Sequence, residues 1–274
     1  MIGRLLAALL IFMMARSEAP ALELTGNPIQ GGLIIGKVEP GTSVRLADQD
    51  LRVSDDGRFV FGIGRDAGDA LELVWRSPGG ASGTETLAVK KRDWKISRIN
   101  GLPKRMVAPG PEDLLRIQKD NRAIGAVRTL DTEATDFLQT FRWPVPGRIS
   151  GVFGSQRILN GKPKHFHNGV DIAAPVGALV QAPASGRVVL VRQDMFYSGK
   201  TVMLDHGHGV TSVYIHMSEI LVSEGRRIEQ GAPLGRVGMT GRATGPHLHW
   251  GVSWFRTHVD PALLAGPMPG AKTN

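Results

Sequence analysis

Histidine is unevenly distributed in this 274-residue sequence, because all eight histidines lie in its C-terminal half. Among them, His167 precedes Asp171 by four positions, His247 and His249 are two positions apart, and His216 lies between these pairs. Catalytic zinc is usually held by three protein ligands, drawn from imidazole nitrogens and carboxylate oxygens, with one coordination position left open. These five residues therefore predict a hydrolytic zinc site with two imidazoles to spare.

The local patterns show how such side chains could converge. Alternate residues of a β-strand face the same side, so His247 and His249 would project together from an extended segment. His167 and Asp171 would also share a face if their segment is extended. The sequence contains no Cys, which excludes a disulfide framework and a thiolate metal site. A metal would thus be held by histidine and carboxylate, and such a centre lowers the pKa of a bound water towards about 7.

Several spaced motifs resemble one known family, the lysostaphin-type or LytM-like zinc metalloendopeptidases of peptidoglycan. The segment His167–Asp171 is similar to the family's H-x-G-x-D signature, and Thr240–His249 is similar to its closing T-G-x-x-T-G-x-H-x-H. Leu204–Gly207 and Tyr214–Met217 match intermediate landmarks in the same order. The resemblance covers about half of the chain, roughly Trp143–Leu263. It implies one Zn²⁺ per chain and the peptide stems of peptidoglycan as the partner.

The resemblance also implies a role for each matching residue. His167, Asp171 and His249 correspond to the metal ligands, and His216 and His247 to the catalytic histidines. One imidazole would take a proton from the attacking water, and the pair would stabilise the oxyanion and serve the leaving amine. The sequence leaves open which of the two histidines is the base.

One position departs from the pattern of some relatives, which place a Tyr several residues before the first ligand. The corresponding segment Ile158–Lys162 has none. Either Asn160 supports the transition state in place of that Tyr, or the two catalytic histidines suffice.

The remaining histidines have structural interpretations. His165 could compete with its neighbour as a ligand on spacing alone, but the family pattern disfavours it. His206 and His208 flank a glycine and indicate loop structure. His258 is expected at the surface or in a structural hydrogen bond, and Tyr214 is either core or cleft wall.

The elements that must position the site are expected to be mostly β. Short alternating runs between turns predict a small β-sandwich-like domain of the immunoglobulin kind over residues 22–95. Residues 96–142 read as a connector with a helix near 111–129, which begins at a proline followed by acidic residues. Residues 143–265 predict a LytM-like peptidase domain built on an antiparallel sheet, and 266–274 a C-terminal tail.

The N-terminus predicts export. Residues 1–21 combine a basic start, an apolar run and small residues at the end, which is typical of a secretory signal peptide. The apolar run is shorter than the roughly 20 residues of a membrane-spanning helix. We therefore expect a periplasmic or cell-wall-associated protein with no stable membrane span after signal cleavage.

Charge is concentrated in the half that holds the histidines. The whole chain has a formal net charge of +8. From residue 143 onwards the sequence contains 13 Lys and Arg and only 7 Asp and Glu. A basic surface attracts polyanions. For an exported chain these are anionic wall polymers rather than nucleic acid. The sequence does not indicate an oligomeric state.

Together these patterns predict an exported zinc metalloendopeptidase that hydrolyses peptide cross-links of peptidoglycan through zinc-activated water, in cell-wall remodelling. One alternative is a non-catalytic peptidoglycan-binding protein or an activator of other wall hydrolases, although such proteins typically lose zinc ligands. A second is a lipoyl- or biotinyl-like carrier, which would need a lysine motif at an exposed hairpin that this sequence lacks.

Overall fold

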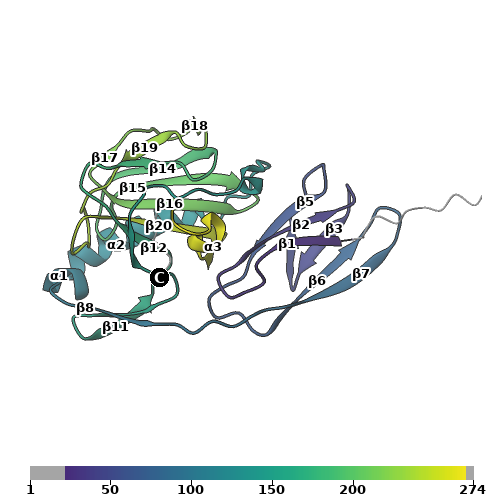
Figure 1. Ribbon diagram of the computed structural model, residues 1–274, viewed down its shortest axis with the longest axis horizontal. Helices are drawn as coiled ribbons and strands as arrows, with labels where there is room; N and C mark the ends of the chain where they lie inside the picture. The colour runs from purple at the N-terminus through teal and green to yellow at the C-terminus, as the bar shows by residue number, and fades with distance from the viewer. Residues whose placement is uncertain (1–21, 270–274) are drawn as a thin grey trace, which may run out of the picture.

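Two β domains joined by a connector make up the protein (Figure 1). The computed structural model describes residues 22–269, so the expected signal peptide and the end of the C-terminal tail lie outside the described residues. Within that range, no helix has both the length and the apolar character needed to cross a membrane. The expectation of a mostly β fold with antiparallel sheets is confirmed.

The N-terminal domain consists of two small antiparallel sheets. The first contains β1 (Leu22–Gly26), β2 (Leu33–Val38) and β5 (Arg58–Gly62), and the second β4 (Gln49–Leu51), β3 (Ser43–Leu46), β6 (Ala70–Arg76) and β7 (Ser82–Ala88). Along β3, Val44 and Leu46 are buried while Ser43 and Arg45 are exposed. This alternation gives each strand one face for the core.

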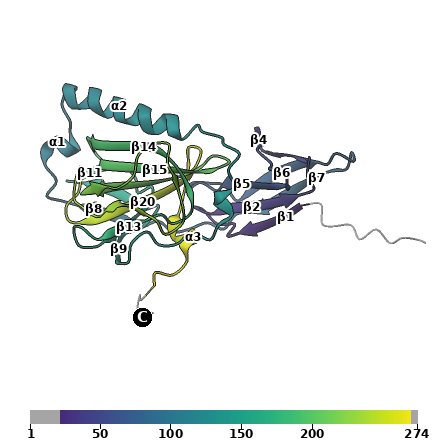
Figure 2. The same cartoon turned by 90° about the horizontal axis from the view of Figure 1, so that it is seen from above.

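The connector is partly regular. It contains β8 (Ile96–Ile99), α1 (Lys104–Val107), α2 (Pro111–Val127) and the short 3₁₀ helix η1 (Asp136–Leu138). α2 begins with Pro111 and has Glu112 and Asp113 in its first turn, where proline and acidic side chains favour a helix start. Figure 2 shows α2 lying across the sheet of the C-terminal domain, over β14 and β15.

The C-terminal domain is built on an eight-stranded antiparallel sheet, in the order β18-β14-β15-β16-β20-β12-β9 with β21 paired to β20. Its strands are β9 (Arg148–Gly151), β12 (Val170–Ala173), β14 (Gly186–Met195), β15 (Gly199–Gly207), β16 (Val210–Met217), β18 (Arg227–Ile228), β20 (His247–Trp254) and β21 (Thr257–Val259). A second small sheet joins β13 (Leu179–Gln181), β19 (Pro233–Arg236) and β17 (Glu219–Ile220), and α3 (Pro261–Ala265) follows β21.

The two faces of the large sheet have different partners. Tyr214 on β16 and Trp250 on β20 are directly paired, fully buried and part of the main core. Val213 and Gly251 form the next pair, and alternation places them on the opposite face. On that face Val213 belongs to a smaller core together with Val127 of α2. The strand residue His249 shares this second face with Gly251.

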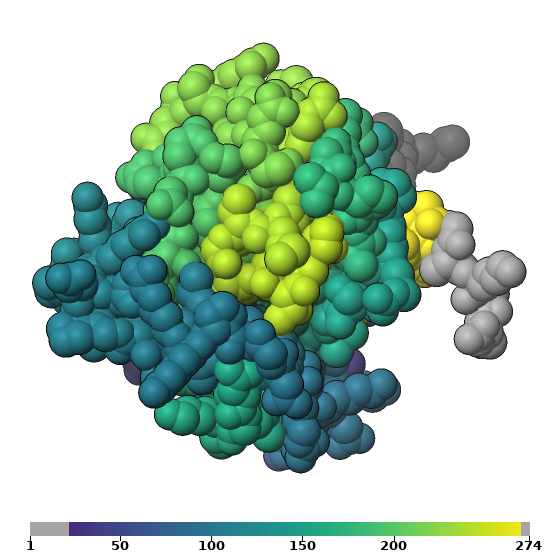
Figure 3. All heavy atoms as spheres, turned by 90° about the vertical axis from the view of Figure 1, so that its left-hand side faces the viewer, coloured from purple at the N-terminus to yellow at the C-terminus, as the bar shows by residue number. Residues whose placement is uncertain are grey.

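The connector also contacts the C-terminal domain through its strand β8 and its helix α1. β8 pairs in parallel with β10 (Gln156–Leu159), which forms a hairpin with β11 (Lys162–Phe166). The α1 carbonyl groups of Val107 and Met106 accept hydrogen bonds from Lys164, at 3.0 Å, and from Arg242, at 3.3 Å. In Figure 3 the blue atoms of the first part of the connector border the yellow-green atoms at the centre of the view. The connector therefore contacts both the β10–β11 hairpin and the loop before β20 in the C-terminal domain.

Candidate metal centre

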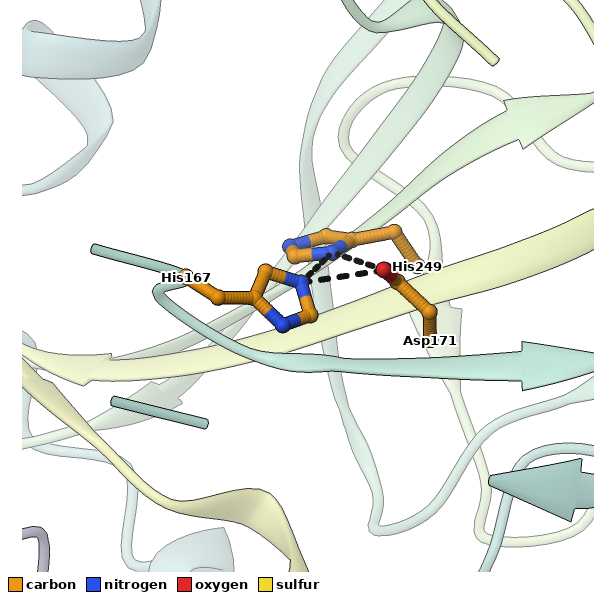
Figure 4. A group of neighbouring side chains, drawn as sticks. All are labelled: His167, Asp171 and His249. Carbon is orange, nitrogen blue, oxygen red and sulfur yellow. Dashed lines mark hydrogen bonds and ion pairs between the residues drawn. The ribbon is translucent and has the colours of Figure 1, made fainter. Parts of the chain in front are cut away.

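Three side chains that the sequence places far apart meet at one point. His167 Nε2 lies 3.0 Å from Asp171 Oδ1 and 2.9 Å from His249 Nδ1, and His249 Nδ1 lies 2.8 Å from the same carboxylate oxygen. Figure 4 shows the three side chains pointing towards one another. His167 and His249 are buried, and Asp171 is partly buried. The structure thus brings together all three expected ligands.

Strand register explains how two of them meet. Asp171 on β12 is directly paired with His249 on β20, so their side chains leave the same face of the sheet as neighbours. His167 approaches from the loop between β11 and β12. In that loop, a Cβ on Gly169 would lie 2.3 Å from the carbonyl oxygen of Trp250 and 2.9 Å from the His249 ring. The glycine of the H-x-G-x-D pattern is therefore required for the close approach of this loop.

The donor set fits a divalent cation. His167 Nδ1 donates a hydrogen bond to the carbonyl oxygen of Val152 at 3.0 Å, so Nε2 of the neutral ring carries a lone pair. That lone pair faces a carboxylate oxygen, which is also an acceptor. Two acceptors at this distance repel each other unless a cation lies between them. Two imidazoles and one carboxylate with an open position is the ligand set of catalytic zinc.

Burial and mutual contacts set the charge states of the two paired ligands. Burial acts to raise the pKa of Asp171, but the close imidazoles of His167 and His249 outweigh it, so this pKa lies well below its usual value. Burial lowers the pKa of His249 to about 4, although the Asp171 carboxylate partly opposes the shift. At neutral pH the site therefore presents a carboxylate and a neutral imidazole, which are the forms that bind a metal.

The sequence did not predict one residue that contacts the site, Arg157. Its Nη2 atom lies 2.7 Å from Asp171 Oδ2, so the guanidinium holds the oxygen that points away from the histidines. Arg157 lies on β10, a strand that was not expected, and no local pattern distinguishes it from the other arginines. Only the hairpin of β10 and β11 reveals the contact.

The two expected catalytic histidines lie beside the centre. The ring centroids of His216 and His247 are 4.7 Å apart, and His216 lies 6.5 Å from the ring of His249. His247 Nε2 is 3.9 Å from Asp171 Oδ1. The structure therefore gathers all five residues of the predicted constellation.

Both rings are oriented by backbone carbonyl groups. His216 Nδ1 donates to Thr240 at 2.7 Å, and His247 Nδ1 donates to Gly245 at 2.8 Å. With Nδ1 protonated in this way, the neutral form of each ring has its lone pair on Nε2. Burial lowers the pKa of His216 to about 3, with further contributions from His247 and His249, so this ring is neutral at pH 7.

Asn160, considered as a transition-state donor, hydrogen-bonds the connector. Its side-chain oxygen accepts from the backbone N–H of Leu102 at 3.2 Å, and its amide donates to the Leu102 carbonyl at 2.7 Å. The side chain therefore ties the β10–β11 turn to the connector. Both of its polar atoms are already used there.

The other aromatic candidates are structural. His206 is buried and hydrogen-bonds Ser185 and Ser212, and Tyr214 is fully buried in the core. The two ring nitrogens of His208 are buried without a hydrogen-bond partner among the described residues. His258 is half-buried, and its ring lies 6.4 Å from that of Phe166. These four join no metal-ligand group in the described part of the chain, and neither does His165, which is exposed.

Comparison with known proteins agrees with this geometry. The model of peptidase family M23 matches residues 165–261. Over 113 residues the chain is 41% identical to peptidoglycan DD-endopeptidase ShyA of Vibrio cholerae, which covers 40% of this chain and 26% of that protein. Over 122 residues it is 38% identical to the DD-carboxypeptidase/endopeptidase Mpg of Neisseria meningitidis, which covers 44% of this chain and 28% of that protein. The chain thus spans about a quarter of the length of these relatives.

A solved structure matches over nearly the whole chain. It is a putative peptidase M23 from Pseudomonas aeruginosa, 31% identical, with a TM-score of 0.69. The alignment covers 88% of this chain and 96% of that one, so it includes the N-terminal domain and connector as well as the site. The chain belongs to peptidase family M23.

Proposed function

We propose that this protein is an exported zinc metalloendopeptidase that hydrolyses peptide cross-links of peptidoglycan during cell-wall remodelling. The observation that carries the proposal is the convergence of three metal-binding donors, with two imidazoles that keep free Nε2 lone pairs beside them. The name of the relative ShyA, a peptidoglycan DD-endopeptidase, supports peptidoglycan as the substrate. The signal-peptide pattern in residues 1–21 supports a periplasmic or cell-wall location.

In this proposal His167, Asp171 and His249 hold one zinc ion per chain. The ion would supply Lewis acidity, which polarises the scissile carbonyl and lowers the pKa of a water molecule. Arg157 would keep Asp171 ionised and oriented from behind.

The remaining steps belong to His216 and His247. Each has its Nδ1–H fixed on a backbone carbonyl, so Nε2 can take a proton from the attacking water. The resulting imidazolium can return that proton to the leaving amine. Before it does so, the same imidazolium N–H can donate to the oxyanion, and the two rings are close enough to act on one carbonyl group.

Zinc analysis and product analysis on the purified protein test the proposal. We expect about one zinc per chain, and mass spectrometry of digested peptidoglycan should show cleaved peptide cross-links. The variant His249→Ala should lose both properties, because a ligand is removed. His216→Ala should retain zinc and lose about 10²- to 10⁴-fold in rate, the usual contribution of a general acid–base group.

His165→Ala is the matched control, since His165 is exposed, belongs to no metal-ligand group and should keep both properties. A wild-type protein that binds zinc but leaves peptidoglycan intact would favour the alternative of a non-catalytic wall-binding protein or activator.

A further inference from the structure

Segment 240–245, which precedes β20, orients both proposed catalytic histidines. His216 Nδ1 donates to the carbonyl oxygen of Thr240 at 2.7 Å. His247 Nδ1 donates to the carbonyl oxygen of Gly245 at 2.8 Å. The two acceptors lie at the two ends of the same short segment. A displacement of this segment would therefore rotate both imidazole rings, so the contacts that fix the segment also fix the catalytic pair.

The turn 196–198, between β14 and β15, holds this segment and His216 through its backbone. The carbonyl oxygen of Tyr197 accepts the backbone N–H of Arg242 at 2.8 Å. The next carbonyl oxygen, that of Ser198, accepts the backbone N–H of His216 at 2.9 Å. The φ of His216 is 65°, and a conformation of this kind persists only where several contacts impose it. The turn supplies one of these contacts, and segment 240–245 supplies another.

Two glycines allow the turn and the segment to approach closely. A Cβ on Gly199 would lie 2.2 Å from Oγ1 of Thr240. A Cβ on Gly241 would lie 2.5 Å from the carbonyl oxygen of Tyr197. Both glycines also have a positive φ, of 63° and 71°, which glycine adopts without strain. The turn and the segment therefore pack backbone against backbone, and a movement of one is transmitted to the other.

The side chain of Arg242 adds a further connection. Its guanidinium lies 4.1 Å from the centre of the Tyr197 ring, and its Nη1 donates to the carbonyl oxygen of Met106 in α1 at 3.3 Å. Burial lowers the pKa of Arg242, and no carboxylate is among the groups that act on this pKa. The aromatic face and the carbonyl oxygen are therefore the contacts that stabilise the partly buried cation. Arg242 thus joins its own segment to the turn and to the connector.

The helices of the connector contact the same turn. Asp120 of α2 accepts the backbone N–H of Phe196 at 2.8 Å. The guanidinium of Arg105 in α1 lies 5.4 Å from the centre of the Phe196 ring. The connector therefore binds the turn at Phe196, while segment 240–245 binds it at the next residue. Arg242 closes this chain of contacts, because its side chain bonds to α1 as well.

We propose that Arg242 is a positioning residue for the peptidase reaction. It joins segment 240–245 to the turn and to α1, and so holds Nε2 of His216 and of His247 in the direction that proton transfer requires. It acts through the two backbone carbonyl groups that fix the rings. The inference rests on the proposed function, because that function gives the histidines their acid–base role. A misplacement of about 1 Å in a catalytic group can cost about 10²-fold in rate.

Nitrogen-15 NMR of the imidazole rings in the zinc-loaded protein tests the positioning without relying on activity. The ring nitrogen shifts report which nitrogen carries the proton, and in the wild type we expect the Nδ1–H form for both His216 and His247. Arg242→Gln removes the charge and the planar fork, so the segment should loosen and both rings should become mixtures of the Nδ1–H and Nε2–H forms. His206 is an internal reference that should not change, because its ring bonds two serines outside this segment.

Kinetics on cross-linked peptidoglycan dimers give the second readout. Arg242→Gln should lower kcat by about 10- to 100-fold, because both rings lose their orientation, and should leave KM and zinc content as in the wild type. Arg242→Lys should recover most of the rate, since an ammonium group can also lie over Tyr197 and donate to Met106. A purely structural role would lower the melting temperature and leave the ring tautomers and kcat of the folded protein unchanged.

The matched control is Arg236→Gln. Arg236 also donates to a backbone carbonyl, that of Gly177 at 3.0 Å, but it pairs with Glu219 on the small sheet. This variant should keep the tautomers and the kcat of the wild type. Should Arg242→Gln fail to fold, Tyr197→Leu takes its place, because it removes the ring under the guanidinium and keeps the backbone contacts of the turn.

Two results would overturn the positioning role. One is a folded variant in which the rings of His216 and His247 keep the wild-type tautomers, and the other is a folded variant with the kcat of the wild type. If the tautomers depend on Arg242 but the wild type cleaves no dimer, the segment is positioned as inferred and the hydrolase proposal fails.

Discussion

A single backbone conformation brings His216 into the centre. Tyr214, two residues earlier on β16, faces the main core, and regular alternation would direct His216 the same way. Instead His216 has a φ of 65°, in the left-handed region that non-glycine residues seldom adopt, and its ring lies against His247. Backbone strain of this kind is concentrated at functional sites. The sequence motif identifies His216 as a candidate catalytic residue. The backbone conformation that directs its ring towards His247 depends on tertiary contacts, which the motif does not contain.

Arg157 yields a prediction at the same scale. Arg157→Gln removes the positive charge that holds Asp171 Oδ2, and the ligand then loses its orientation. Residues that support metal ligands typically contribute 10- to 100-fold in metal affinity, so we expect about that loss in zinc affinity. Competition with a chromophoric chelator measures it.

Arg192→Gln is a suitable comparison, because Arg192 also pairs with a carboxylate, Glu224, but at an exposed position without metal ligands. It should leave zinc affinity unchanged. Equal zinc affinity in Arg157→Gln and the wild type would show that the ion pair only stabilises the hairpin.

At the scale of elements, the sequence predicted the strands better than their partners. The alternation of Val44 with Leu46, and the paired histidines of β20, identified strands because one face of each is buried. β8 was not predicted, since its partner β10 lies about 60 residues later and its own residues are mostly half-exposed. Local patterns contain no information on such a parallel pairing. The helix α2 was expected, but not its place on the face that carries the metal centre.

The connector contact of Asn160 leads to the second prediction. Asn160→Ala removes two hydrogen bonds to Leu102, which should destabilise the docking of the connector by about 1–3 kcal/mol. Hydrogen exchange of the backbone amides in β8 and β10 should then become faster. Zinc content should not change, because Asn160 is no ligand.

Asn100→Ala serves as the reference, since Asn100 is exposed in the same connector. The two roles considered for Asn160 predict different results. If Asn160→Ala lowers kcat while exchange in β8 and β10 stays slow, the residue acts on the transition state rather than on the connector.

At the scale of the whole molecule, the N-terminal domain takes part in building the site region. Arg65 of that domain donates to the carbonyl of Gly154 at 2.7 Å and lies over the ring of Phe166, the residue before His167. Arg92 reaches Asp260, which caps α3. The N-terminal domain therefore contacts the C-terminal domain next to the loop that carries His167. The solved relative from Pseudomonas aeruginosa aligns over both domains.

The stability of the whole fold should depend on pH through its buried neutral histidines. Burial lowers the pKa of His206, whose ring nitrogens hydrogen-bond Ser185 and Ser212. Unfolding restores an ordinary pKa near 6.5 to this histidine. Below that pH the unfolded chain therefore binds a proton more readily than the folded chain does. Stability from this group is present above pH 6.5 and is lost as the pH falls below it. The free energy of unfolding should therefore fall between pH 7.5 and 5.5, with a contribution from His206.

Urea denaturation at these two pH values, followed by tryptophan fluorescence, isolates that contribution. His206→Gln lowers stability at both values, because a glutamine cannot make both hydrogen bonds from the same position. It should nevertheless reduce the difference in the free energy of unfolding between pH 7.5 and 5.5, because glutamine does not titrate. His165→Gln, at an exposed position, should leave the difference as in the wild type. An undiminished pH dependence in His206→Gln would mean that the proton taken up on unfolding binds elsewhere.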